Sequence, residues 1–182
     1  MRVCLLCLLL WAGTSHALMV EVAAPDALKP LLTQHLEATR AARQGEVLSD
    51  EEVSRLRIRS LESARELLAT QGYFSPRIDS AKTRENDDWL LRISVDPGAL
   101  TLVRGVTINF TGAVAGDEAA NRRLRARIQR QFGLQPGMPF RQADWEAAKQ
   151  AALGSLLAGV YVAASLAASE ARVDPAASSA DL

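Results

Sequence analysis

The chain has 182 residues, enough for one medium domain or two small ones, and 48% of them are hydrophobic, as in an ordinary globular protein. Lysine plus arginine equals aspartate plus glutamate at 21 each, so net charge does not predict a polyanionic partner. Composition therefore excludes a disordered chain and a strongly basic nucleic-acid-binding protein.

The first residues have the pattern of a secretory signal peptide. Arg2 gives a positive start, residues 3–12 are an apolar run, and small residues precede Ala17. We predict cleavage between Ala17 and Leu18. A membrane anchor is the alternative, but the run is far shorter than the ~20 residues that span a bilayer. Both cysteines lie in this segment, so the mature chain would have no disulfide and no cysteine metal site.

The first predicted module begins with a short strand and a helix. Residues 18–22 form an apolar run, which predicts a strand. Leucines then recur at helical spacing from Leu28, and Gly45 is expected to end this helix. Pro30 leaves the starting residue open, because proline fits the first turn better than a helix interior.

A second helix is predicted from a capping box. The Ser49 side chain can accept a backbone N–H, and Glu52 can reach back three residues. Gly72 is expected to end the helix. Ser60 could cap a fresh start, so a bent pair of helices is the alternative.

A predicted hairpin completes this module. Residues 76–84 read as a strand, residues 85–88 as a turn, and residues 89–96 as a second strand with one buried face. The residues expected to be buried are Trp89, Leu91, Ile93 and Val95, and those expected to be exposed are Leu90, Arg92, Ser94 and Asp96. Pro97 and Gly98 then break the chain, which indicates a domain boundary.

A second cycle of the same elements starts at residue 99. Residues 106–110 alternate between apolar and polar and predict a strand. Two helices follow, separated by a turn at residues 137–140. A weaker strand is predicted over residues 163–173, and residues 176–182 leave room for a fragment of another.

The two helices of this cycle have different surfaces. The first presents a basic face, which we interpret as solvated, with acidic lipid headgroups or an acidic partner as the alternative. Its arginines are Arg122, Arg123, Arg127 and Arg130. The second helix is predicted to begin with a cap at Asp144. Its expected buried stripe is Trp145, Ala148, Ala152, Leu153, Leu156 and Leu157.

Signals of catalysis are weak throughout. His35 is the one histidine after the predicted cleavage site; it lies among leucines, and we expect it to be half-buried, since no partner for a general base is visible. Carboxylates at Asp87 and Asp88 fall in a predicted turn. The segment from Gly112 to Gly116 lacks the lysine of a phosphate-binding loop. We therefore predict no enzyme, no cofactor, no metal and no small-molecule substrate.

Short motifs in this order resemble POTRA (polypeptide-transport-associated) modules of TamA-like outer-membrane assembly factors in the BamA/TamA superfamily. The motif residues are Gly72, Tyr73, Pro76, Trp89, Pro97, Gly98, Gly137, Phe140, Trp145 and Tyr161. The element order and the resemblance predict an α+β fold of two tandem β-α-α-β-β modules, each a three-stranded mixed sheet with two helices on one face. The modules are residues 18–98 and residues 99–182, the second with a truncated last strand.

The resemblance also implies a cellular role. Such factors have a periplasmic arm of POTRA modules followed by an outer-membrane β-barrel, and they work with a TamB-like inner-membrane protein on autotransporters and other barrel clients. Barrel strands of ~9–11 alternating residues do not appear before Leu182, so a fragment or a truncated gene is expected. A soluble exported adaptor, or a remnant without assembly activity, is the alternative.

The edge of the first sheet is the predicted binding surface. An edge strand offers unpaired N–H and C=O groups to an extended peptide, which is called β-augmentation. The chosen residues are Arg77, Ile78, Asp79, Ser80, Ala81 and Lys82. Their charges are typical of exposed edges, and an edge that is only protected against aggregation explains them equally well.

Overall fold

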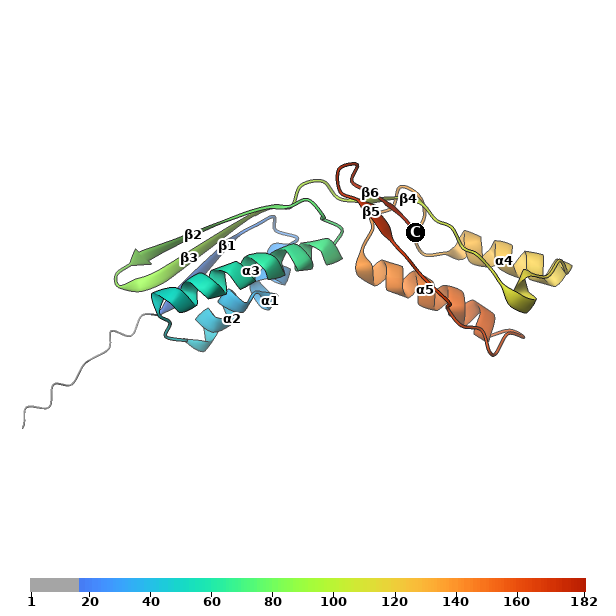
Figure 1. Cartoon of the computed structure of the whole chain (residues 1–182), viewed down its shortest axis with the longest axis horizontal. Coiled ribbons are helices and arrows are strands. Elements are labelled where there is room, and N and C mark those ends of the chain that lie inside the picture. The colour runs from blue at the N-terminus through green and yellow to red at the C-terminus, as the bar shows by residue number, and fades with distance from the viewer. Residues whose placement is uncertain (1–16) are drawn as a thin grey trace, which may run out of the picture.

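The computed structural model describes residues 17–182. They form two modules, each with a three-stranded mixed sheet and helices packed along one face (Figure 1). This is the α+β architecture of tandem POTRA-like modules that the sequence predicts. The signal peptide is predicted over residues 1–17, of which residues 1–16 lie outside the described residues, and Leu18 begins the first strand.

In the first sheet the last strand in sequence lies in the middle. β1 (Leu18–Ala23) pairs parallel with β3 (Asp88–Asp96), and β2 (Arg77–Glu85) pairs antiparallel with β3 on its other side. Trp89 and every second residue after it face the helices. The burial predicted for this face is therefore confirmed.

Leu90 is 2% exposed, although the alternating pattern predicts it on the open face. It lies in the central strand, between Met19 of β1 and Thr83 of β2. The predicted hairpin turn is also shorter than expected: it consists of Asn86 and Asp87, whose φ angles of 50° and 70° fit a two-residue type I′ turn.

The sequence predicts one helix between Leu28 and Gly45, and this prediction is wrong, because the segment forms two helices. The structure has α1 (Lys29–His35) and α2 (Glu37–Gln44), separated by Leu36, whose backbone is extended. Pro30 lies in the first turn of α1. The break is stabilised from elsewhere, because the Ser60 hydroxyl accepts the Ala38 N–H at 3.1 Å at the start of α2.

The next helix, α3 (Asp50–Thr70), is continuous over 21 residues. The predicted capping box is present: the Glu52 N–H donates to the Ser49 Oγ at 3.3 Å, and the Ser49 N–H donates to the Glu52 carboxylate at 2.7 Å. Ser60 does not start a new helix. Its side chain is fully buried against α2.

The second sheet is smaller. β4 (Leu102–Gly105) pairs parallel with β6 (Ser179–Asp181), and β5 (Arg172–Asp174) pairs antiparallel with β6. The final strand, predicted as a fragment, is therefore formed and central, although only three residues long. The strands predicted over residues 106–110 and 163–173 are wrong for most of their length, since the ladder reaches neither 106–110 nor 163–171.

This module also contains three helical segments, of which the last contributes Trp145 and Ala148 to the core. They are η1 (Gly112–Ala115), α4 (Ala119–Gln131) and α5 (Gln142–Leu157). The basic face of α4 is exposed, as predicted. α5 begins two residues before Asp144, and no side chain caps it, so the predicted cap is wrong. Asp144 lies instead in the first turn, where a carboxylate still favours the helix dipole.

The two modules are joined by direct contacts. The Thr101 N–H donates to the Gly72 carbonyl at 2.9 Å, and the Phe140 N–H donates to the Thr101 carbonyl at 2.9 Å. The rings of Phe74 and Phe140 stack with centroids 6.0 Å apart. Gly72 has a φ of +91°, and a Cβ atom there would lie 2.2 Å from the Phe140 carbonyl oxygen. The junction therefore needs glycine at residue 72.

Each module has its own apolar core. Leu32, Leu36, Leu68 and Leu91 are completely buried in the first, and Leu134 in the second. The second core includes three buried aromatic residues, of which Phe132 and Trp145 form an edge-to-face pair at 6.1 Å. Among the helices within residues 17–182, none is both long and apolar enough to cross a membrane.

Replacing Ser60 by alanine should destabilise the first module by about 1–3 kcal/mol, because it leaves a buried N–H of α2 without its acceptor. Chemical denaturation measures the free energy of unfolding. Ser63→Ala in the same helix is the control; its side chain is only partly buried, so a smaller loss is expected. Equal losses in the two variants would contradict the role assigned to Ser60.

Replacing Gly72 by alanine should destabilise the protein more than Gly137→Ala does. Both glycines have φ near +90°, but a Cβ atom at Gly137 meets nothing within 4 Å. Gly137→Ala should therefore cost only the strain of a left-handed backbone conformation, about 1–2 kcal/mol. Gly72→Ala adds a clash with the Phe140 carbonyl. Thermal unfolding of both variants checks this, and similar melting temperatures would refute it.

Candidate protein-binding edge

The β2 strand is the longest open edge of the two sheets. All nine of its residues pair with β3 on one side. On the other side no strand pairs with it anywhere in the described part of the chain. In an antiparallel strand, alternate residues point both N–H and C=O away from the partner, so about four residues present free backbone groups.

The other edges are shorter or already covered. β1 has six residues, and a bridge between Ala17 and Val47 covers its beginning. The free side of β4 is occupied by the turn at residues 137–140: the Gly137 N–H donates to the Val103 carbonyl at 2.7 Å, and the Val103 N–H donates to the Met138 carbonyl at 2.8 Å. β5 has only three residues.

The side chains of β2 alternate between two faces. Ile78, Ser80 and Lys82 are partly buried on the helix face, and the residues between them are exposed. Arg77, Asp79 and Ala81 thus lie on the open face of the edge. Of the six predicted site residues, these three are the ones that a strand added beside β2 would meet from the solvent side.

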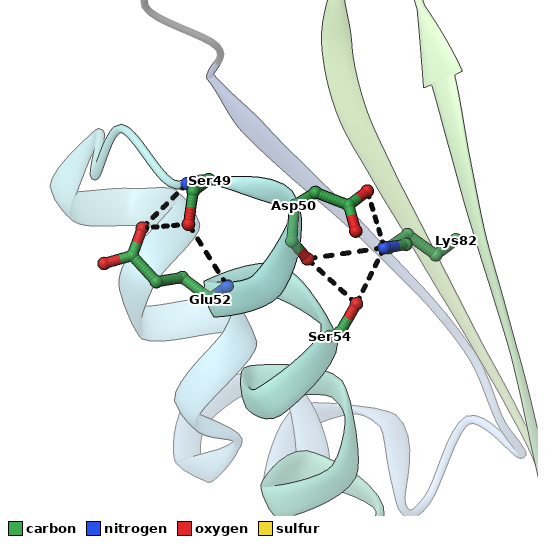
Figure 2. A network of polar contacts seen from close by, with 5 residues as sticks. All are labelled: Ser49, Asp50, Glu52, Ser54 and Lys82. Atoms are coloured by element: carbon green, nitrogen blue, oxygen red, sulfur yellow. Dashed lines mark hydrogen bonds and ion pairs between the residues drawn. The ribbon is translucent and has the colours of Figure 1, made fainter.

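The charge of Lys82 suggested that its side chain lies exposed at the open edge, but the side chain points toward the helices instead. Its Nζ lies 2.9 Å from the Asp50 carboxylate and 2.7 Å from the Ser54 hydroxyl, at the beginning of α3 (Figure 2). The side chain is 20% exposed. The same amine lies 4.8 Å from the centre of the Trp89 ring. Lys82 therefore fastens the middle of β2 to the helix layer.

A second contact fixes β2 one helical turn further along. Arg57 of α3 reaches the Ser80 hydroxyl with its Nη1 at 3.4 Å. Asp50, Ser54 and Arg57 are spaced four and three residues apart, which puts them on one face of α3. Sequence reasoning missed these anchoring residues, although their spacing was visible as a polar line on the helix.

The open face of the first sheet carries an ion pair at its centre. Arg92 of β3 donates to Glu21 of β1 at 2.7 Å and lies 3.7 Å from Glu85 of β2. These side chains are more than 45% exposed, so the pairs add little stability. On this face one arginine is shared between two glutamates.

The remaining motif residues have structural positions. Tyr73 packs against the first core, and Pro76 directly precedes β2. Trp145 is buried in the second core. The Tyr161 hydroxyl donates to Asn121, a buried residue that sequence analysis did not single out; the Asn121 amide also donates to the Ala113 carbonyl at 3.0 Å.

His35 is exposed at the end of α1, so its predicted half-buried position is wrong. The helix ends there, which turns the residue out of the apolar stripe. Within residues 17–182, no three or more His, Cys, Asp or Glu side chains lie close enough together to hold a metal ion.

One family model matches the first module. Residues 25–97 match the model described as POTRA domain, TamA domain 1. This segment is therefore similar to a POTRA domain, and the match includes all of β2 and β3. No functionally curated protein matches the sequence significantly.

Matches to solved structures cover more of the chain. BamA from Haemophilus ducreyi lacking POTRA domains 1–3 is 22% identical over 75% of this chain and 23% of its own, with a TM-score of 0.39. The N-terminal domain of Omp85 from Thermosynechococcus elongatus is 14% identical over 92% and 60%, with a TM-score of 0.41. Haemophilus influenzae BamA POTRA3-5 is 12% identical over 92% and 58%, with a TM-score of 0.37. The chain thus spans less than two thirds of each.

The capping box should make stability depend on acidic pH. The Ser49 backbone N–H and then its hydroxyl lower the pKa of Glu52 below the ordinary 4.5. A lowered carboxylate pKa stabilises the folded state fully above the ordinary value, and this contribution is lost as the pH falls through the lowered value. Unfolding free energies of the wild type and Glu52→Gln should therefore differ most above pH 4.5 and converge below it.

The control for this titration is Glu66→Gln, on the same helix but outside the capping box. Its difference from the wild type should change less with pH. If Glu52→Gln and Glu66→Gln follow the same pH profile, the hydrogen bonds from Ser49 do not account for the effect.

Proposed function

We propose, from the similarity of residues 25–97 to a POTRA domain, that this chain is a periplasmic protein-binding arm of an outer-membrane protein assembly factor. It would hold partner or client chains by β-augmentation along β2. The observation that carries this proposal is a nine-residue edge strand, open on one side, in a module of a family named for polypeptide transport. Export through the predicted signal peptide would deliver it to the periplasm.

The strength of such binding follows from its chemistry. Each added backbone hydrogen bond contributes roughly 0.5–1.5 kcal/mol net, and about four free groups along β2 would form such bonds. Ordering of the incoming peptide offsets part of this gain. The expected complex is weak and reversible, which suits a client that must be released to its final location.

The anchoring of β2 supports the same function. A binding edge gains affinity when it is already in its bound conformation, because no ordering cost remains on its side. Lys82 and Ser80 fasten β2 to α3 at two points. The side chains that face solvent, Arg77 and Asp79, have opposite charges, so they would favour neither sign of charge in a partner. Binding would then depend mainly on an extended partner backbone and would accept many sequences.

The client class follows from length. Strands of outer-membrane barrels have ~9–11 residues with alternating apolar and polar side chains, close to the nine residues of β2. Autotransporters and other barrel proteins are therefore the proposed clients, with a TamB-like inner-membrane protein as a further partner. The competing hypothesis is a soluble exported adaptor whose charged edge only prevents aggregation.

Site-specific photo-crosslinking tests the proposal. A photoreactive residue at Asp79 should crosslink a synthetic ten-residue peptide with the alternating pattern of a barrel strand. The same probe at Glu21 on β1 and at Glu66 on α3 serves as the control for the opposite edge and for the helix layer, and should crosslink much less. Crosslinks from the control positions alone would show that β2 is the wrong edge, and crosslinks from none would favour the adaptor.

A further inference from the structure

Helix α4 concentrates positive charge in the second module. Its 13 residues include five arginines and no aspartate or glutamate. Arg125 has a structural role, because its Nη1 donates to the carbonyls of Val114 at 2.6 Å and Gly116 at 2.8 Å and so fastens η1 to the helix. The other four arginines are exposed, so their guanidinium groups are accessible to a partner.

The four exposed arginines lie on one side of α4, which we call its basic face. They are Arg122, Arg123, Arg127 and Arg130. With 100° of rotation per residue, they fall within an arc of about 140°. Ala119 and Ala126 are the other two residues in this arc, so the face contains no carboxylate and no bulky apolar side chain. Ile128, on the opposite side of the helix, is buried.

The charge of the basic face is not balanced by carboxylates of the protein. Five arginines elsewhere in the chain form ion pairs: Arg55, Arg59, Arg92, Arg104 and Arg172. Within residues 17–182, none of the four on the basic face does. Arg122 donates instead to the Asp117 backbone carbonyl. The carboxylate nearest to it along the chain, Glu118, accepts a hydrogen bond from the Asn121 amide at 2.8 Å.

The basic face contains an open depression of about 330 Å³. Arg122, Arg123 and Arg130 line it together with Ala119 and Ala126. Because an alanine side chain ends at Cβ, a small anionic group can lie between the longer arginine side chains. Guanidinium groups bind phosphate with paired N–H donors, so phosphate is the ligand chemistry that fits this depression.

The composition of the basic face favours a membrane over a macromolecule as the source of the phosphate or other anion. A stable protein interface has buried aromatic or apolar anchors at its centre, and this face offers only alanine. Single-stranded nucleic acid is bound with aromatic side chains that stack on bases, and the face has none. An anionic lipid surface needs neither feature, since it attracts each nearby cationic side chain directly.

We propose that the basic face of α4 docks the second module on a membrane that contains anionic phospholipids. From Arg122 to Arg130 the face extends along about 12 Å of helix, so several headgroups can be contacted at once. Each arginine near such a surface strengthens binding roughly fivefold. The attachment is therefore reversible and depends on the charge of the lipids.

This docking surface is independent of the proposed function of β2. It lies in the other module and binds through side-chain charge, whereas β2 binds through its backbone. Substitutions on α4 should leave crosslinking from Asp79 unchanged. Failure of one proposal can therefore be distinguished from failure of the other.

Sedimentation with lipid vesicles tests the proposal. The chain from Leu18 onward contains every helix and strand of both modules and lacks the apolar residues 3–12, which would bind vesicles by themselves. Phosphatidylcholine vesicles that contain phosphatidylglycerol should bind it more than roughly tenfold better than vesicles of phosphatidylcholine alone. Raising the salt from about 0.1 M to about 1 M should release it, because the screening length falls from ~10 Å to ~3 Å. Equal binding to both vesicles would overturn the proposal.

Exposed arginines of the first module give a matched control. Arg123→Gln combined with Arg127→Gln should weaken binding to the anionic vesicles about 25-fold, which is two factors of five. Arg40→Gln combined with Arg65→Gln changes the net charge equally at exposed helical positions. Because distant charges are screened, this control should stay within about twofold of the unmodified chain. Equal losses in the two double variants would refute the site on α4.

A polyglutamate peptide distinguishes an acidic protein partner from a membrane. If the peptide binds with the same dependence on Arg123 and Arg127 while the anionic vesicles do not, the partner is an acidic protein and the proposal is wrong. Binding of neither probe also overturns it. If circular dichroism shows that the double variant does not fold, the single variant Arg130→Gln decides, with an expected loss of roughly fivefold.

Discussion

Pairing of the central strand on both sides is the constraint on which each module depends. A strand in the middle of a sheet buries its backbone only if both neighbours extend as far as it does. β3 meets this condition over most of its length, and it carries Trp89, Leu91 and Ile93 of the first core. β6 meets it for three residues only, so the second core closes around a shorter sheet.

The same constraint decides which strands are edges. A centrally placed last strand turns β2 into an edge, and contacts from α3 then fasten that edge to the helix layer. In the second module the turn containing Gly137 covers β4.

The junction links these two features. Gly72 follows α3, which supports β2, and its close approach to the Phe140 carbonyl connects it to the turn that covers β4. The stacked rings of Phe74 and Phe140 add an apolar contact at the same place. Motif residues that appear scattered in the sequence thus meet at one interface, where they hold the modules against each other.

The sequence by itself determined features that depend on neighbouring residues: the capping box at Ser49, the alternating burial of β3, and the exposed basic face of α4. Only the tertiary structure decided the break at Leu36, which depends on Ser60 in another helix, and the inward position of Lys82, which depends on Asp50 32 residues away. Residues 106–110 lie between these cases. Their alternation is local, but a strand also needs a partner, and hydrogen bonds between distant segments cannot be read from the spacing of residues in one of them.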